Sequence, residues 1–81
     1  MDFCVYIIQS SVHKRFYTGM SSNLENRLAK HNSGLNTSTR TGAPWHLIWN
    51  SEFLSKTEAS ELERKIKKRG AARYLNDITS T

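Results

Sequence analysis

The stretch that most constrains the fold is residues 16–31, FYTGMSSNLENRLAKH. Its first three residues are aromatic or β-branched and favour a strand, and Gly19 predicts a turn directly after them. Ser22 and Glu25 have the spacing of a capping box, in which two side chains satisfy backbone groups at the start of a helix. The chain is therefore expected to pass from strand to helix within a few residues.

One face of this predicted helix is partly polar. Positions 24, 27, 28 and 31 share that face, because a helix repeats every ~3.6 residues. Leu24 and Leu28 are apolar, as a core-facing stripe requires, but Arg27 and His31 are not. A buried charge destabilises a fold unless it is paired or reaches water. Because the preceding strand carries Tyr17, we take Arg27, His31 and Tyr17 as candidate site residues.

The composition indicates one small folded domain with a basic surface. The chain has 81 residues, of which 37% are hydrophobic, and we expect a single domain over residues 1–81. Its formal net charge of +5, from 12 Lys and Arg against 7 Asp and Glu, favours polyanionic partners, with nucleic acid first. No apolar run is long enough to cross a bilayer, and no signal-peptide pattern is visible. With a single cysteine, Cys4, the chain is expected to be cytoplasmic and to have no membrane partner.

Two strands are predicted to form an antiparallel hairpin near the start of the chain. Residues 3–8, FCVYII, are apolar on both alternating faces, which is typical of a central strand that is covered on both sides. The polar segment 9–14 predicts a turn back to the strand that begins at Phe16.

A polar loop and a third strand are predicted after the first helix, which is expected to end at Gly34. Residues 35–44 are polar, and their one charged residue, Arg40, is either a phosphate contact or an ordinary exposed arginine. Residues 45–53 alternate well enough for a strand. Its apolar residues at every second position are expected to share one face: Trp45, Leu47 and Trp49.

A second helix is predicted over residues 56–69, with Ser55 and Glu58 as its capping box. Its apolar stripe is interrupted at Glu63. Two interpretations stay open: an ion pair with Lys67 four residues on, worth roughly a few tenths of a kcal/mol, and a functional carboxylate.

A short final helix is predicted over residues 71–78, after Gly70. Basic residues gather at this end of the chain, where they form either a solvated surface or a nucleic-acid contact. The candidate nucleic-acid contacts are the basic residues of this end and of the loop: Arg40, Lys67, Lys68, Arg69 and Arg73.

These residue types suit the hydrolysis of a phosphodiester. The reaction needs a group that activates water, a cation near the scissile phosphate, and compensation of the charge that develops in the transition state. Glu63 is a candidate ligand for Mg²⁺, which uses few protein ligands and keeps several waters. The planar guanidinium of Arg27 matches phosphate oxygens. Tyr6, Tyr17 and His31 are the candidates for proton transfer; a phenol serves as a base at neutral pH only where a nearby cation lowers its pKa of about 10.

Five segments stand in an order and spacing that is more specific than any one of them: VYII at 5–8, YTG at 17–19, R-x-x-x-H at 27–31, TRTGAPW at 39–45 and E-A-x-x-x-E at 58–63. In these segments the chain resembles a GIY-YIG nuclease domain, close to the small stand-alone bacterial members described as excinuclease-C-like proteins. The resemblance covers almost the whole chain.

The resemblance implies an α/β fold with a three-stranded antiparallel sheet flanked by helices, in the order β-β-α-β-α-α. It also implies cleavage of DNA with Mg²⁺ or Mn²⁺, in DNA repair or recombination. By this resemblance Tyr17 acts as the general base or assists it, and Tyr6 hydrogen-bonds in the site. Arg27 stabilises the phosphate, His31 stands where the family has Tyr or His, and Glu63 holds the cation.

The chain departs from the family pattern in several places. Cys4 replaces the glycine of the first tripeptide and Thr18 the isoleucine of the second, where backbone shape and packing matter rather than proton transfer. Met20 stands where many members have a lysine, which removes one phosphate contact. Gly19 and Asn76 are the expected supporting residues, Asn76 by a loose match to an asparagine after the last helix.

Three interpretations of function follow. The first is an endonuclease that cuts one strand per active site of duplex, branched or single-stranded DNA, as a monomer or weak dimer. We expect weak sequence specificity, with DNA structure or a protein partner supplying the target. The alternative is a non-catalytic nucleic-acid-binding module of the same fold, and the third is a protein-interaction domain. Only the first predicts that Glu63→Ala removes a metal-dependent activity while fold and affinity remain.

Overall fold

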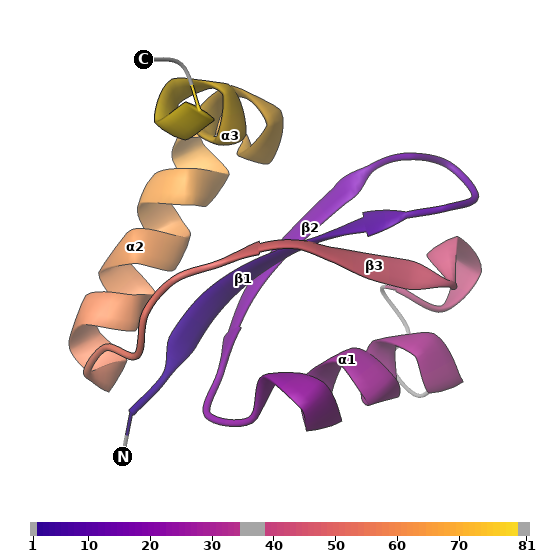
Figure 1. Cartoon of the computed structure of the whole chain (residues 1–81), viewed down its shortest axis with the longest axis horizontal. Coiled ribbons are helices and arrows are strands. Elements are labelled where there is room, and N and C mark those ends of the chain that lie inside the picture. The colour runs from indigo at the N-terminus through magenta and orange to yellow at the C-terminus, as the bar shows by residue number, and fades with distance from the viewer. Residues whose placement is uncertain (1, 35–38, 80–81) are drawn as a thin grey trace.

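The computed structural model describes residues 2–34 and 39–79, which form a three-stranded antiparallel sheet with helices on both sides (Figure 1). The strand order is β2-β1-β3, with β1 (Cys4–Ser10) between β2 (Phe16–Ser21) and β3 (Trp45–Asn50). The helical elements are α1 (Leu24–Ser33), the 3₁₀ turn η1 (Arg40–Gly42), α2 (Lys56–Arg69) and α3 (Ala71–Thr79). This arrangement confirms the predicted fold class and element order. None of the described helices combines the length and apolar character that crossing a bilayer requires.

The central strand β1 is buried on both faces, as its sequence predicts. Val5 and Ile7 point to one face and pack with the apolar stripe of α2. Tyr6 and Ile8 point to the other and pack with Trp45 and with the two leucines of α1. Because side chains alternate along a strand, one segment supplies two separate apolar clusters, and α1 and α2 each cover one of them (Figure 1).

The predicted turn at Gly19 is wrong, because Gly19 continues β2 directly opposite Tyr6. A Cβ atom at position 19 would lie 2.6 Å from Tyr6 Oη, closer than real Cβ contacts come. The glycine therefore makes room for the tyrosine ring across the strand pair.

The start of α1 also differs from the prediction. Asn23 is the N-cap, and its side chain accepts a hydrogen bond from Asn26 N at 3.1 Å, so the capping box expected at Ser22 is wrong. The hydroxyl of Ser21 accepts from Asn23 N at 3.0 Å and donates to Asn23 O at 2.9 Å. These two bonds fix the backbone of the capping residue. At the other end, Gly34 adopts the predicted left-handed conformation, with a φ of 83°.

Strand β3 ends at Asn50, and the expectation that Trp45, Leu47 and Trp49 share one face is wrong. The register with β1 shifts between Ile7 and Ile8, so that Trp49 lies opposite Ile7 and Leu47 opposite Ile8. An extra residue in one strand reverses the alternation beyond it. Trp45 therefore packs with the α1-side cluster, whereas Trp49 packs with the α2-side cluster.

The connections around the helices bring distant segments together. Ser55 and Glu58 form the predicted capping box of α2. The Asn32 side chain at the end of α1 accepts from Trp45 N at 2.5 Å and donates to Trp45 O at 3.1 Å, which joins α1 to the start of β3. Of the predicted polar loop, residues 35–38 lie outside the described residues, and η1 makes the part around Arg40 regular.

Candidate active site

A chain of hydrogen bonds runs through the buried side of the site. Tyr6 Oη and His31 Nε2 are 2.8 Å apart, and His31 Nδ1 and Thr39 Oγ1 are also 2.8 Å apart. The three residues come from β1, from the last turn of α1 and from the residue before η1. Their exposed fractions are 1%, 0% and 0%. We call Tyr6, His31 and Thr39 the buried chain.

Long-range contacts position the buried chain. The indole N–H of Trp45 donates to the Thr39 carbonyl at 2.7 Å, and Trp45 is itself attached to Asn32 of α1. Thr39 is therefore held against the turn of α1 that carries His31.

Burial sets the protonation state of the two rings of the buried chain, Tyr6 and His31. Burial, and then the positive charge of Arg27, lower the pKa of His31 below its ordinary value. Burial raises the pKa of Tyr6 well above its ordinary value, and the neighbouring Tyr17 adds to the rise. Both rings are therefore neutral at neutral pH. A neutral imidazole donates through one ring nitrogen and accepts through the other, so the buried chain has a single direction.

Tyr17 lies next to the buried chain but nearer the surface. It stands opposite Ile8 in the strand pair, on the same face of the sheet as Tyr6. Its ring meets His31 edge-on, with 4.9 Å between the ring centroids, and meets Trp45 at 6.3 Å. Tyr17 is half-buried, so its ring is fixed by packing while part of it stays accessible.

Two charged residues from opposite sides of the sheet act on the same tyrosine. Arg27 is exposed on α1, and Glu63 is half-buried on α2. After burial and Tyr17, the next influences on the pKa of Tyr6 are Arg27, which lowers it, and Glu63, which raises it. Arg27 and Glu63, which are far apart in the sequence, therefore influence the pKa of the same phenol in opposite directions.

Glu63 has the chemistry of a magnesium ligand in an open setting. Its carboxylate oxygen lies 3.4 Å from Lys67 Nζ, and its side chain is 23% exposed. Within residues 2–34 and 39–79 no group of three or more His, Cys, Asp or Glu residues gathers to hold a metal ion. One accessible carboxylate fits Mg²⁺, which protein sites commonly bind through one or two carboxylates, waters and substrate phosphates. The ion pair with Lys67, expected as the simpler interpretation, is present as well.

A groove of about 630 Å³ adjoins Tyr17 on the side of α2 and α3. We call it the basic groove. Its lining combines aromatic residues of β2 with cations from the hairpin and from the two helices: Arg15, Phe16, Tyr17, Lys67, Arg69 and Arg73. The structure therefore brings three of the predicted nucleic-acid contacts next to Tyr17, together with Arg15, which no sequence pattern indicated.

The other predicted contacts lie elsewhere. Lys68 faces a second depression, with Tyr74 and Ile78, and Arg40 is exposed on η1. Asn76 is exposed on α3, where its carbonyl accepts a hydrogen bond from the Thr79 hydroxyl of the same helix. Of the predicted set, these three residues are thus not gathered at Tyr17.

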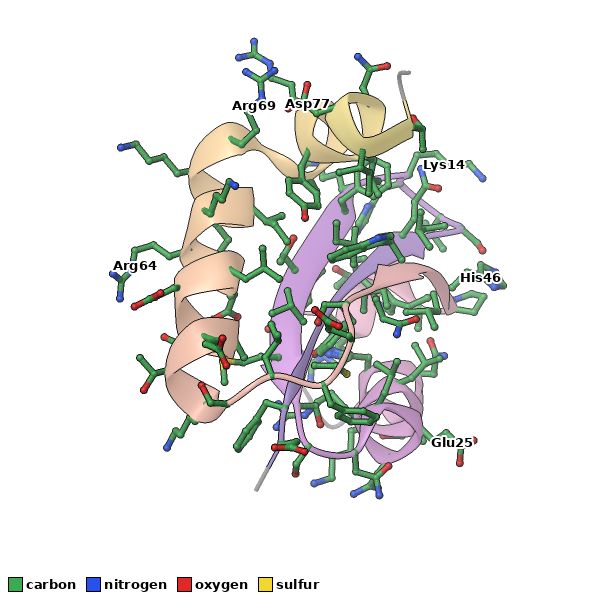
Figure 2. The ribbon with its side chains drawn as sticks, turned by 60° about the vertical axis from the view of Figure 1, so that its left-hand side comes forward. Lys14, Glu25, His46, Arg64, Arg69 and Asp77 are labelled. Carbon is green, nitrogen blue, oxygen red and sulfur yellow. The ribbon has the colours of Figure 1, made fainter. Side chains whose placement is uncertain are left out.

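Arg69 is already engaged at the junction of α2 and α3. Its Nε donates to Asp77 Oδ2 at 2.9 Å and its Nη2 to Asp77 Oδ1 at 3.0 Å. Figure 2 shows the two residues together where the helices meet. Any phosphate in the basic groove competes with this carboxylate for Arg69.

Two residues near the candidate site, Thr39 and Arg15, were not predicted as site residues, although Thr39 opens the TRTGAPW segment that carries the family resemblance. Thr39 lies in a polar segment that predicts an exposed loop, and its burial depends on Trp45 and His31 from other elements. Arg15 stands just before β2 and interrupts no apolar stripe. Arg15 lines the basic groove because the β1–β2 hairpin packs beside α3.

Comparisons with known proteins agree with this geometry. A family model described as the GIY-YIG catalytic domain matches residues 2–76. UPF0213 protein SH2523 from Staphylococcus haemolyticus is 39% identical over 64 residues, which cover 78% of this chain and 77% of the relative. UPF0213 protein CPE1444 from Clostridium perfringens is 36% identical over 77 residues, which cover 94% and 82%. UPF0213 protein NP_0776A from Natronomonas pharaonis is 36% identical over 67 residues, which cover 82% and 78%.

No solved structure matches the chain. The family match spans every described strand and reaches into α3, and it includes all the residues of the buried chain, Tyr17, Arg27 and Glu63. The chain therefore belongs to the GIY-YIG catalytic domain family, a family of nucleases.

Proposed function

We propose that this protein is a divalent-metal-dependent endonuclease that hydrolyses DNA phosphodiester bonds, one strand per active site, in DNA repair or recombination. One observation carries the proposal: Tyr17 belongs both to the surroundings of the buried chain, through its contact with His31, and to the lining of the basic groove. A proton-handling group thus lies where a polyanion is attracted.

In this proposal the buried residues position the site, and the exposed residues contact water and DNA. Tyr6 and His31 are closed to solvent, so they hold Tyr17 and its surroundings rather than contact DNA. Tyr17 is the accessible phenol and takes the proton of the attacking water, or orients that water for a second base. Arg27, exposed on α1, grips non-bridging phosphate oxygens through its planar guanidinium.

Glu63 is the proposed ligand of the metal ion. Its carboxylate is accessible and has no second acidic neighbour in the described part of the chain, which leaves the other positions to water and phosphate. When bound, Mg²⁺ or Mn²⁺ supplies compensation for the negative charge that develops on the phosphate. A metal ion held there would compete with Lys67 for the Glu63 carboxylate.

The test is nicking of end-labelled duplex, flap, fork and single-stranded DNA with Mg²⁺ or Mn²⁺. Tyr17→Phe and Glu63→Gln should each lower the rate by about 10²-fold or more, the usual range for a lost acid–base group. Tyr74→Phe is the matched tyrosine control, because Tyr74 packs on Trp49 in the other apolar cluster. Glu61→Gln is the matched glutamate control, exposed on the same helix as Glu63.

The controls should nick DNA like the wild-type protein, and circular dichroism should show that all four variants are folded. Cleavage that survives unchanged in Glu63→Gln would remove the proposed metal ligand. A folded wild-type protein that binds DNA and never cuts it would replace the nuclease with a non-catalytic nucleic-acid-binding module.

A further inference from the structure

We infer that the basic groove holds the backbone of the DNA strand on one side of the scissile bond, with Arg15 and Arg73 as its phosphate-binding residues. The inference rests on the proposed function, because the groove is placed relative to Tyr17. It names a binding site for a phosphodiester strand that is separate from the phosphate contact of Arg27.

The charges of the groove are not all equally available. Lys67 pairs with Glu63, and Arg69 is bonded through two nitrogens to Asp77. Across residues 2–34 and 39–79, neither Arg15 nor Arg73 forms an ion pair. Both are exposed, so these two guanidinium groups are the cations of the groove that an incoming phosphate meets without a competing carboxylate.

The shape of the groove suits a strand at close range. Its lining also includes small residues at the junction of α2 and α3, Gly70, Ala71 and Ala72. A Cβ atom built on Gly70 meets no atom within 4 Å, so the junction is open there. Phe16 packs on the α2 side of the sheet and also lines the groove, where its ring is available for a base to stack on.

The groove and Arg27 belong to different sides of the sheet. No residue of α1 lines the groove, whereas Arg27 belongs to α1, and α1 lies across the sheet from α2 (Figure 1). A strand whose scissile phosphate lies between Tyr17 and Arg27 can therefore enter the groove on one side only. The inference predicts that cleavage depends on nucleotides on that side much more than on the other.

Binding is tested first, with the wild-type chain in EDTA so that no cleavage occurs. The probes are a fluorescein-labelled single strand and the same sequence as a duplex, and the readout is fluorescence anisotropy across a salt series. Arg15→Ala and Arg73→Ala should each weaken binding several-fold and lower the slope of log affinity against log salt by about 0.7–0.9, the value for one lost phosphate contact.

Arg64→Ala is the matched control. It removes the same charge from α2, but Arg64 points away from the sheet and lines a different depression (Figure 2). Its salt slope should change far less. Slopes for Arg15→Ala and Arg73→Ala that equal the Arg64→Ala slope would overturn the inference, because net charge alone would then explain binding.

Cleavage gives the second readout. With Mg²⁺, oligonucleotides shortened from either end should lose cleavage sooner from one end, and the Arg15→Ala/Arg73→Ala variant should lose this asymmetry. Wild-type cleavage that tolerates shortening equally from both ends contradicts the inference and leaves the nuclease intact. Lowered salt slopes without cleavage by the wild type would instead support the groove and reject the proposed nuclease.

Discussion

Thr39 shows how much of the site depends on one hydroxyl. It meets the Nδ1 atom of His31 in a place with no access to water, so a side chain of the same shape without the hydroxyl leaves a buried nitrogen unsatisfied. We expect Thr39→Val to lower the free energy of unfolding by about 1–3 kcal/mol in urea titrations. Thr39→Ser, which keeps the hydroxyl, should lose clearly less.

A stability change alone would also follow from poor packing, so the His31 ring is the sharper readout. Nitrogen NMR shifts of the imidazole report which ring nitrogen carries the proton. Those shifts should move in Thr39→Val and stay near the wild-type values in Thr39→Ser. Unchanged ring shifts in Thr39→Val would show that Thr39 does not orient His31.

His31 also makes the protein sensitive to mild acid. Because burial lowers its pKa in the folded state, the unfolded chain binds a proton below pH 6.5 that the folded chain does not. The unfolded state holds more protons in that window, so the free energy of unfolding falls as pH drops below about 6.5. The melting temperature should therefore decline between pH 7 and pH 5.

Substitutions separate His31 from the other histidines. His31→Gln should flatten the decline in melting temperature, whatever it does to stability at pH 7. His46→Gln should keep the decline, because His46 is exposed on β3 (Figure 2). An equally steep decline in His31→Gln would assign the acid sensitivity to other groups.

At the scale of elements, the start of α1 offers a direct comparison of two neighbouring residues. Asn23 accepts a hydrogen bond from a backbone amide that otherwise has no partner in the helix, and Ser22 does not. Asn23→Ala should therefore lower the free energy of unfolding by about 0.5–2 kcal/mol, measured by chemical denaturation. Ser22→Ala should change the free energy of unfolding little. A larger loss for Ser22→Ala than for Asn23→Ala would show that Ser22 is the cap.

Local rules predicted the elements but not every detail within them. The capping box at Ser55 and the left-handed Gly34 depend on neighbours in sequence, and both are confirmed. Three residues near the start of α1 are all good caps, and the choice among them depends on hydrogen bonds of Ser21 that no spacing reveals. The role of Gly19 depends on Tyr6 across the sheet, so a local rule that associates glycine with turns gave the wrong answer.

The same limit applies to β3 and to the site. Perfect alternation predicts that Trp49 lies on the same face of β3 as Trp45. The register shift against β1 depends on how two strands pair, so the periodicity of one strand cannot reveal it. Arg27, His31 and Glu63 are candidates because they interrupt apolar stripes. Thr39 and Arg15 interrupt nothing, and they enter the site only through tertiary packing.

For the molecule as a whole, the pair of Arg69 and Asp77 sets how much positive charge the basic groove offers. The hydrogen bond and charge of Arg69 lower the pKa of Asp77, so the carboxylate stays ionised at neutral pH and keeps hold of the guanidinium. We expect Asp77→Asn to release Arg69 and to strengthen DNA binding several-fold at low salt. The measurement is fluorescence anisotropy with a labelled duplex.

A control of equal charge is available on the other side of the molecule. Glu25→Gln also raises the formal net charge from +5 by one, but Glu25 lies in the first turn of α1, outside the basic groove (Figure 2). The gain in affinity should be larger for Asp77→Asn. Equal gains would mean that overall charge, rather than release of Arg69, governs binding.

The alternation of β1 has a consequence for how this protein can change. Val5 and Ile7 serve only the cluster against α2, while Tyr6, between them, starts the buried chain on the opposite face. Along residues 4–8, positions that tolerate substitution should therefore alternate with positions that do not. Libraries that vary Val5 and Ile7 among aliphatic residues, with matching changes at the buried α2 residues Ala59 and Ile66, offer a route to heat-resistant versions that keep Tyr6 and Glu63 in place. Substitutions on one face of this strand can therefore accumulate without changing the side chains that pack on the other face.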